Sequence, residues 1–391
     1  MNLNRTIRLG KKEVGLLDFL MFLALIAVGI VVRVSLFPYK SGDWEVFLEP
    51  WTNQLKTFGF KALAGSFYNY TPIYMYILWI LTLLPIPTLL GIKLVSVLFD
   101  LLLAGVTARV TGQIKKGCNP LIPFAFVWLA PTVISNSSMW GQCDSIYTFF
   151  VLLTLYFLLK EKSAKAMLVY GIAFSIKLQS VFFAPVLILL FFLKKIKFRE
   201  FFLIPAVYLV SIVPVWLAGR PLKELLTIYL GQAGGKNDTL SVIYPNLYYL
   251  IGNDVYQELY GRTAIVFTVA VLLVLFYYVL KKAYERGELS SQLLLLTALL
   301  GGCVIVFLLP SMRERYSYMV DILAVVYGCL NWKRLYIPAI KIFLSYMAYT
   351  TYYRYGMFIS YEWLAVLQIV VIGVLTADLL RELHREPLNI P

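Results

Sequence analysis

Apolar residues occur along this chain in blocks that are long enough to cross a lipid bilayer. The clearest blocks are Leu16 to Val34, Phe201 to Ala218, Ala264 to Leu280 and Leu293 to Pro310. A helix needs about 20 predominantly apolar residues to span the hydrocarbon core. The pattern therefore predicts an all-α, polytopic integral membrane protein with about 12 transmembrane helices. No polar stretch is long enough to build a separate core, so residues 1–391 are predicted to form a single transmembrane domain.

Composition supports this class and excludes others. The chain is 60% hydrophobic and 14% charged, whereas soluble domains carry about a quarter charged residues. Its net charge of +14 comes from short basic clusters between apolar blocks, which indicates membrane lipids as partners and no nucleic acid. The four cysteines form no C-x-x-C pair, and the one histidine, His384, lies in the charged tail. Neither a zinc site nor a disulfide framework is indicated.

The basic clusters mark the predicted cytoplasmic turns, since cytoplasmic loops are enriched in Lys and Arg. Both termini are then cytoplasmic, and two long segments, 38–70 and 219–261, face the outside. Residues 71–113 read as two crossings broken near Pro85 and Pro87, which conflicts with a cytoplasmic position for the following Lys115 and Lys116. Either one segment there is half-embedded, or this cluster departs from the rule.

Several polar groups gather at the predicted outer membrane face, where burying a charge costs at least about 3 kcal/mol on insertion scales. Asp43 and Glu45, in the segment S-G-D-W-E, suit a general base or a metal contact, although a solvated loop has the same composition. Tyr70 and Thr71 begin the next membrane segment, where an aromatic belt would look the same.

Two further segments interrupt apolar sequence with polar residues. Trp140, Gln142 and Asp144 lie beside a glycine, as in a broken helix that lines a cavity, or in a plain turn between helices. Lys177 and Gln179 follow an apolar block. A lysine in this position either extends to the interface or binds phosphate as a point charge.

The last candidates follow the apolar block that ends at Pro310. Arg313 and Arg315 lie at the predicted outer face, although basic residues usually collect on the cytoplasmic side. Their guanidinium groups match the geometry of phosphate oxygens. The alternative is that they are paired surface charges. The remaining candidates are Glu314, Tyr316 and the weaker Asn246. Together these groups combine carboxylates, cations and aromatic rings, which suits a lipid-linked phosphosugar.

The order of the segments S-G-D-W-E, Y-T-P-I-Y, W-G-Q-C-D-S-I-Y, S-I-K-L-Q and R-E-R-Y resembles the GT-C superfamily of polyprenyl-phosphate-sugar glycosyltransferases. It is most similar to the bacterial relatives of the GPI-anchor mannosyltransferases. The resemblance covers roughly residues 15–330, and its more specific parts are W-G-Q-C-D and S-I-K-L-Q. The family often reads H-E-R-Y where this chain has R-E-R-Y, which bears on donor choice.

The resemblance implies an outward first loop that holds the catalytic carboxylate, here Asp43 with Glu45 as the second member. It implies transfer of a mannose-like hexose, with inversion, from a polyprenyl-phosphate donor to a glycan or glycolipid acceptor of the cell envelope. Asp43 is the expected general base, and Lys177, Arg313 and Arg315 are the expected partners of the leaving phosphate. No cofactor is certain; a divalent metal ion at Asp43 and Glu45 stays open, since Arg and Lys alone can balance a monophosphate.

A transporter or flippase of lipid-linked sugars is the main alternative. Such proteins often contain internal repeats with broken helices near the midplane. No repeat is evident in this sequence, and its polar groups collect toward one predicted face.

We predict that the candidate site faces outward. In intact cells, cysteines introduced by Asp43→Cys and Arg313→Cys should react with a membrane-impermeant maleimide. A cysteine introduced by Lys162→Cys, in a predicted cytoplasmic turn, should react only after permeabilisation. Labelling of position 43 only after permeabilisation would reverse the topology and remove the catalytic model that depends on it.

Overall fold

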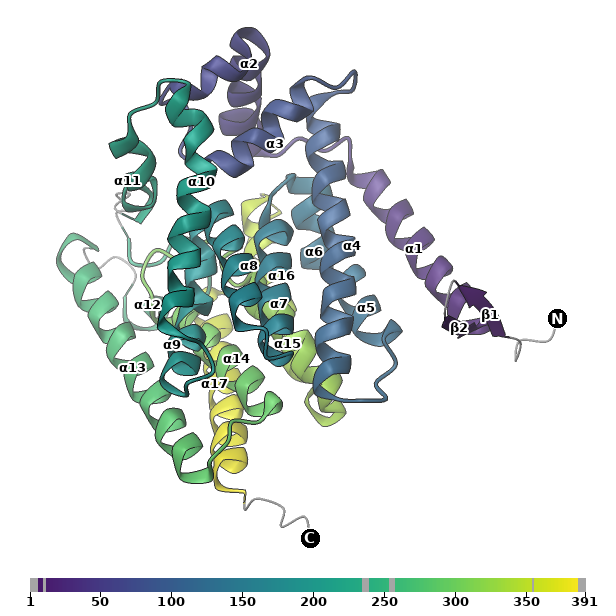
Figure 1. The fold of residues 1–391 in the computed structure, drawn as a ribbon, viewed down its shortest axis with the longest axis vertical. Coiled ribbons are helices and arrows are strands. Elements are labelled where there is room, and N and C mark those ends of the chain that lie inside the picture. The colour runs from purple at the N-terminus through teal and green to yellow at the C-terminus, as the bar shows by residue number, and fades with distance from the viewer. Residues whose placement is uncertain (1–5, 10–11, 234–238, 253–256, 354, 386–391) are drawn as a thin grey trace.

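The computed structural model describes residues 6–9, 12–233, 239–252, 257–353 and 355–385, and helices make up most of them (Figure 1). This confirms the predicted all-α class. A short antiparallel hairpin of β1 (Thr6–Leu9) and β2 (Lys12–Gly15), which the sequence reading did not predict, precedes the first helix.

The helices follow one another with short connections. The first half contains α1 (Leu16–Leu36), α2 (Glu49–Phe58), α3 (Pro72–Thr82), α4 (Thr88–Ile114), α5 (Leu121–Trp128), α6 (Pro131–Ile134), α7 (Asp144–Leu159) and α8 (Ser163–Ile176). The second half contains α9 (Ala184–Phe192), α10 (Leu203–Leu217), α11 (Leu222–Ala233), α12 (Tyr248–Ile251), α13 (Gln257–Arg286), α14 (Ser291–Leu308), α15 (Tyr318–Leu330), α16 (Tyr336–Tyr352) and α17 (Tyr361–His384). Short helical turns complete the set: η1 (Trp44–Leu48), η2 (Gly59–Ala64), η3 (Ser135–Trp140), η4 (Leu178–Phe183), η5 (Phe198–Phe202) and η6 (Trp332–Arg334).

Six helical segments of the described chain are long and apolar enough to cross a membrane, or seven if the bent pair formed by α5 and α6–η3 is one span. They are α1, α4, η5–α10, most of α13, α14 and α17. Five shorter apolar helices, including α7, α8 and α15, lie among them. The protein is therefore a polytopic membrane protein, while the number of about 12 crossings stays a prediction.

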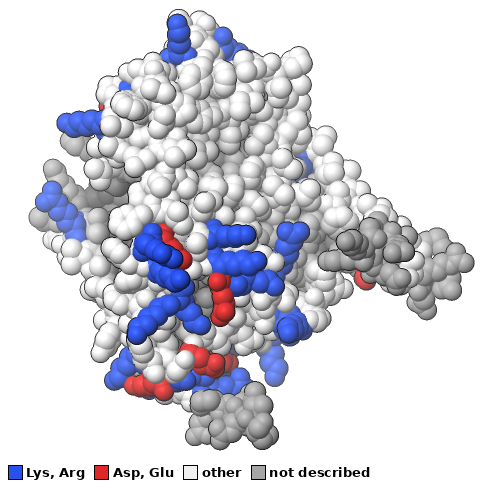
Figure 2. All heavy atoms as spheres, in the orientation of Figure 1, with Lys and Arg blue, Asp and Glu red and all other residues white. Residues whose placement is uncertain are grey.

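The ambiguous region 71–113 contains one long helix and one short one. The 11 residues of α3 extend only about 16 Å at 1.5 Å per residue, which is about half of the hydrocarbon thickness. In Figure 1, α3 stays at the upper end beside α2, and α4 then runs down the length of the molecule. This length favours the half-embedded alternative, which stays a prediction. The end of α4, which Lys115 and Lys116 follow, lies in the lower part of the molecule, as do the ends of α13 and α17 (Figure 1). Figure 2 shows Lys and Arg gathered over the lower part of this face.

The centre of the bundle is formed by α14 and α15, and every residue of α15 is buried.

By contrast, α1 projects away from the bundle in Figure 1 and is largely exposed. It is attached at Gly29, where an added Cβ would lie 2.0 Å from the indole nitrogen of Trp128. That nitrogen donates a hydrogen bond of 2.9 Å to the Leu25 carbonyl. The guanidinium of Arg33 lies 3.7 Å from the Trp128 ring centre and forms a buried ion pair of 3.0 Å with Asp100 of α4.

The segment that follows α1 is held by a buried lysine. Lys93 of α4 donates from Nζ to the carbonyls of Phe37 (2.9 Å) and Tyr39 (2.6 Å), which lie just past the end of α1. Two residues further on, the Ser41 hydroxyl donates a hydrogen bond of 3.0 Å to the carbonyl of Trp140 at the end of η3. These bonds fix the backbone directly before Asp43, so the segment that follows α1 begins from a defined position.

Candidate active site

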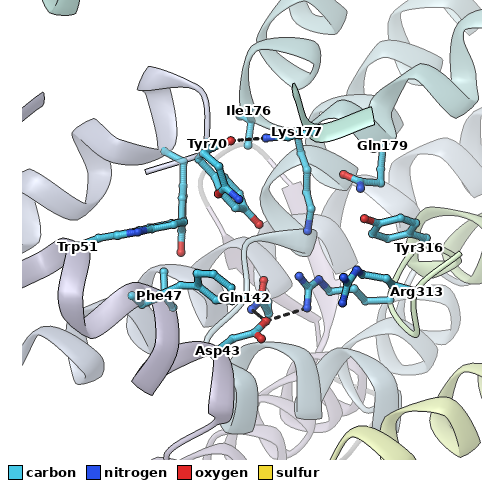
Figure 3. A pocket seen from close by; sticks show the side chains of 15 residues that line it. Asp43, Phe47, Trp51, Tyr70, Gln142, Ile176, Lys177, Gln179, Arg313 and Tyr316 are labelled. Carbon is cyan, nitrogen blue, oxygen red and sulfur yellow. Dashed lines mark hydrogen bonds and ion pairs between the residues drawn. The ribbon is translucent and has the colours of Figure 1, made fainter. Parts of the chain in front are cut away.

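A cavity of about 240 Å³ lies where six segments meet: η1 with α2, the start of α3, the turn before α7, the turn after α8, the end of α11 and the connection between α14 and α15 (Figure 3). Its predicted members are Asp43, Tyr70, Gln142, Lys177, Gln179, Arg313, Arg315 and Tyr316. Its other lining residues are Phe47, Leu48, Trp51, Asn69, Tyr74, Ile176 and Gln232. Segments far apart in the sequence thus contribute to one site.

The carboxylate of Asp43 is held by three side-chain donors. Its Oδ2 accepts hydrogen bonds from the indole of Trp140 (3.0 Å), the amide of Gln142 (2.7 Å) and the guanidinium of Arg315 (2.9 Å). The backbone N–H of Asp43 donates to the hydroxyl of Tyr352 at 2.9 Å. All three side-chain donors reach the same oxygen, so they fix the carboxylate while directing none of their protons to Oδ1.

The turn W-G-Q can supply two of those donors because the helix breaks there. The π-helical turn η3 ends at Trp140, and the φ of the following Gly141 is 74°, which is left-handed and favours glycine. The backbone N–H of Gln142 then donates to the carbonyl of Asn136 at 3.0 Å. This confirms a broken helix beside the cavity, with Trp140 on one side of the glycine and Gln142 on the other.

Arg315 contacts three carboxylates. It lies 2.9 Å from Asp43, 3.3 Å from Glu314 and 3.8 Å from Asp144. Burial raises the pKa of the Glu314 carboxyl above its ordinary value, and the guanidinium of Arg315 partly offsets this effect. The positive charge of Arg315 is therefore engaged by the protein itself.

Lys177 is engaged in the same way. Its ammonium lies 2.5 Å from Oδ1 of the fully buried Asp144, whose Oδ2 accepts a hydrogen bond of 3.0 Å from Asn136. Burial lowers the pKa of Lys177, but the Asp144 carboxylate, together with the neighbouring Tyr70 and Cys143, offsets this and leaves the pKa above its ordinary value. Lys177 and Asp144 thus form a buried pair in the wall of the cavity.

Arg313 differs from the other two cations. It is exposed at the cavity, and no ion pair or hydrogen bond joins its guanidinium to a side chain of the described residues. Figure 3 shows Arg313 and Tyr316 on the side of the cavity opposite Phe47 and Trp51. Within the described lining, Arg313 is the cation whose charge is left for a ligand.

A family model described as glycosyltransferase family 87 matches residues 67–310, well over half of the chain. The chain belongs to glycosyltransferase family 87. This confirms the predicted glycosyltransferase and agrees with the GT-C resemblance, while the mannosyltransferase relatives stay a prediction. No curated protein matches this chain.

The family match contains Gln142 and Lys177 but neither Asp43 nor Arg313. The assignment of those two residues to the site of the glycosyltransferase therefore rests on the geometry of the cavity. In that geometry, the part of the chain that matches the family supplies eight of the fifteen lining residues. The segments on either side of the match supply the carboxylate and the unpaired cation.

Some predicted site residues lie behind or outside the cavity. Thr71 is buried and donates from its hydroxyl to the Ile176 carbonyl at 3.2 Å, so it joins two cavity segments. Asn246 is buried elsewhere, and its side-chain oxygen accepts a hydrogen bond from the backbone N–H of Tyr248. Trp140, Asp144 and Glu314 are buried and contact the lining residues rather than the cavity.

Glu45 lies outside the cavity and is exposed to solvent. The described residues contain no cluster of three His, Cys, Asp or Glu side chains that could hold a metal ion. Asp43 already contacts the Arg315 guanidinium, and Glu45 does not converge on it. These two side chains do not fit a metal site, so the reaction that we propose is built on the chain's own side chains.

Sequence reasoning missed the aromatic support behind Asp43. The ring of Tyr352 stacks on Trp140 with centroids 3.8 Å apart, and the rings of Tyr349 and Tyr353 meet Trp140 at 5.2 Å and 5.4 Å. The cluster of tyrosines at the end of α16 was a visible signal. Nothing in the local sequence, however, connects it with a tryptophan about 210 residues earlier.

We predict that Lys177 and Asp144 are coupled. Removing one partner of a buried ion pair leaves an unpaired charge and typically costs about 3–5 kcal/mol, so Lys177→Met should lower the melting temperature in detergent strongly. Adding Asp144→Asn should recover part of that loss. Lys195→Met is the matched control, since its pair with Glu161 is exposed and such pairs contribute about 0–1 kcal/mol. A double variant whose loss equals the sum of the two single losses would show that the pair is not coupled.

Proposed function

We propose that this family 87 glycosyltransferase moves a hexose from a polyprenyl-phosphate donor to a glycan or glycolipid acceptor at the extracytoplasmic face, with inversion. The supporting observation is that a fixed carboxylate, Asp43, and an unpaired cation, Arg313, line the same cavity. The first can accept a proton and the second can hold a phosphate. The sugar that we propose is mannose-like, following the resemblance of the sequence.

The arrangement of cations supports a donor with one phosphate. A polyprenyl-phosphate-hexose is a phosphodiester with one negative charge. Among the described lining residues, Lys177 and Arg315 have carboxylate partners and Arg313 has none. One unpaired guanidinium matches one phosphodiester charge, and its planar fork matches phosphate oxygens.

Asp43 is the proposed general base. Trp140, Gln142 and Arg315 fix its Oδ2, so Oδ1 is the oxygen that can receive a proton. A base must be held within hydrogen-bond reach of the hydroxyl that it deprotonates. The bond from the Asp43 backbone to Tyr352 adds to this rigidity, so the carboxylate is positioned before the acceptor arrives.

The proposed reaction is a single displacement. The acceptor hydroxyl oxygen attacks the anomeric carbon as the bond from that carbon to the phosphate oxygen breaks, and the hydroxyl proton passes to Asp43. The leaving polyprenyl phosphate takes the electrons of the broken bond and gains negative charge, which Arg313 stabilises with Lys177 and Arg315 nearby. Attack from the face opposite the leaving group inverts the anomeric carbon, as in inverting glycosidases that use water.

The opposite wall suits a sugar ring. Trp51 and Tyr70 meet edge to face with centroids 5.7 Å apart, and Tyr70 and Tyr74 lie 5.1 Å apart. Asn69 and Gln179 add amide groups to the lining. The aromatic faces suit the apolar side of a hexose, and the amides suit its hydroxyls. Trp51 lies opposite Arg313, whereas Gln179 lies on the same side as Arg313 (Figure 3).

The flippase alternative predicts a different product. A flippase moves the lipid-linked sugar intact, whereas the proposed transferase releases one polyprenyl phosphate for each sugar transferred. Purified protein in vesicles with a short-chain prenyl-phosphoryl-hexose and a panel of acceptors separates the two. Release of prenyl phosphate that depends on acceptor supports the transferase, and transbilayer movement of uncleaved donor supports the flippase.

We predict that Asp43→Asn reduces kcat about 10²- to 10⁴-fold, because that is the usual contribution of general-base catalysis. The KM for donor should change little, since the amide keeps the size of the side chain. Glu45→Gln should cost less, because Glu45 lies outside the cavity. If Asp43→Asn turned over within a few-fold of the unmodified enzyme, the base would have to be sought at another carboxylate, with Asp144 and Glu45 first.

We predict that Arg313→Gln weakens donor binding. A hydrogen bond to a charged group contributes about 1.5–3 kcal/mol, so the KM for donor should rise roughly ten- to a hundredfold with a smaller change in kcat. Arg313→Lys should recover part of the loss, because lysine keeps the charge and loses the fork. Lys56→Gln, an exposed cation of α2 outside the cavity, is the control. An unchanged KM in Arg313→Gln would remove Arg313 from the donor site.

A further inference from the structure

Lys341 is a fully buried lysine within α16, outside the lining of the cavity. A buried ammonium in a transmembrane bundle is unfavourable unless it is paired, so its partners indicate why it is present. Its Nζ donates to the hydroxyl of Tyr244 at 2.7 Å and to the side-chain oxygen of Gln368 at 3.2 Å. The same ammonium lies 3.8 Å from Oδ1 of Asp321.

Two of these partners lead to opposite ends of one short segment. We name residues 311–317, which join α14 to α15, the arginine loop, because they carry Arg313 and Arg315. On the first side, the backbone N–H of Tyr244 donates to the carbonyl of Met312 at 3.3 Å. The N–H of Ser311 donates to the carbonyl of Leu240 at 2.7 Å. The segment that carries Tyr244 therefore binds the start of the arginine loop.

On the second side, Asp321 binds the end of the arginine loop. The Ser317 hydroxyl donates to Oδ1 of Asp321 at 2.8 Å, and the backbone N–H of Asp321 donates to the Ser317 carbonyl at 2.9 Å. The carboxylate oxygen that Ser317 reaches is the same one that faces Lys341. A single ammonium thus connects the two anchors of the arginine loop.

Stability alone does not explain the polar contacts that join Lys341, Tyr244, Gln368 and Asp321. One of its buried polar atoms, Nε2 of Gln368, has no hydrogen-bond partner within the described chain. Unsatisfied buried groups are unfavourable, and replacing a buried ion pair by apolar residues is often neutral or stabilising. An apolar core would hold α15 against α16 as well, but it would not join Tyr244 to Asp321.

We propose that Lys341 is a positioning residue that clamps both ends of the arginine loop, so that Arg313 and Arg315 are held at the cavity. Lys341 touches neither the cavity nor Asp43, and it acts through Tyr244 and Asp321. The kinetic consequence of the clamp rests on the proposed function, because it requires that Arg313 bind donor phosphate. The mechanical consequence, a fixed arginine loop, does not require it.

The first test measures the arginine loop without any substrate. A spin label is attached at position 313 through Arg313→Cys in a Cys118→Ser background, and its mobility is recorded in detergent. Tyr244→Phe and Lys341→Met should both increase the mobility of the label. Tyr327→Phe is the matched control, since it also removes a buried hydroxyl hydrogen bond, the 2.7 Å bond to Asp378 at the other end of α15. Unchanged mobility in both variants would overturn the clamp.

The second test measures coupling to Arg313 with a short-chain prenyl-phosphoryl-hexose. Tyr244→Phe loses one hydrogen bond and is expected to fold, and its KM for donor should rise about fivefold, the usual effect of one such bond. In an Arg313→Gln background the same change should have little further effect, because the clamp acts through that arginine. Equal effects of Tyr244→Phe on the KM for donor in both backgrounds would show that the clamp does not act through Arg313.

The two tests separate the clamp from the proposed function. If no variant and no unmodified enzyme transfers sugar from the prenyl-phosphoryl donor, the proposed function fails, and the mobility of the label at position 313 still decides the clamp. If transfer occurs and the label is equally mobile in all variants, the proposed function stands and the clamp fails.

Discussion

The site depends on one guanidinium that is shared by three carboxylates. Arg315 contacts Asp43, Glu314 and Asp144, which come from the segment after α1, the arginine loop and the first residue of α7. In a protein surrounded by lipid, each of these charges would be unfavourable alone. Bringing them together gives each carboxylate a cationic partner, and it also fixes the distance between the Asp43 carboxylate and Arg315. The pairing of these charges therefore also sets the geometry of the site.

This constraint explains the roles of the three cations. Arg315 and Lys177 neutralise carboxylates of the protein, and that leaves Arg313 for the ligand. A site with three unpaired cations would attract any anion and would repel itself. A site with one unpaired cation can discriminate by charge as well as by shape. The cavity is thus preorganised before the donor enters, which is the condition under which fixed charges contribute most to catalysis.

The all-α membrane fold and most of the residues that line the cavity could be predicted from the sequence, because apolar blocks and local motifs reflect local constraints. The arrangement of residues 71–113 could not be predicted, since the apolar sequence of α3 resembles a membrane crossing until the short length of the helix is known. Nor could the position of Glu45: residues two apart on a helical turn point to different sides, so η1 directs Glu45 away while Asp43 faces the cavity. Lys341, Tyr244 and Asp321 were missed because their pairing depends on the register between α15, α16 and a distant loop, which no local pattern encodes.

The attachment of α1 has a consequence for the order in which the protein is built. Arg33 is buried only because Asp100, 67 residues later, pairs with it. Trp128, against which both Gly29 and Arg33 pack, is synthesised later still. During synthesis, α1 leaves the ribosome before either partner exists, so its arginine has neither counter-ion nor aromatic cover at that stage. On this order, α1 can reach its final place only after α4 and α5 have been made, and the segment carrying Asp43, which follows α1, has to wait for the same step.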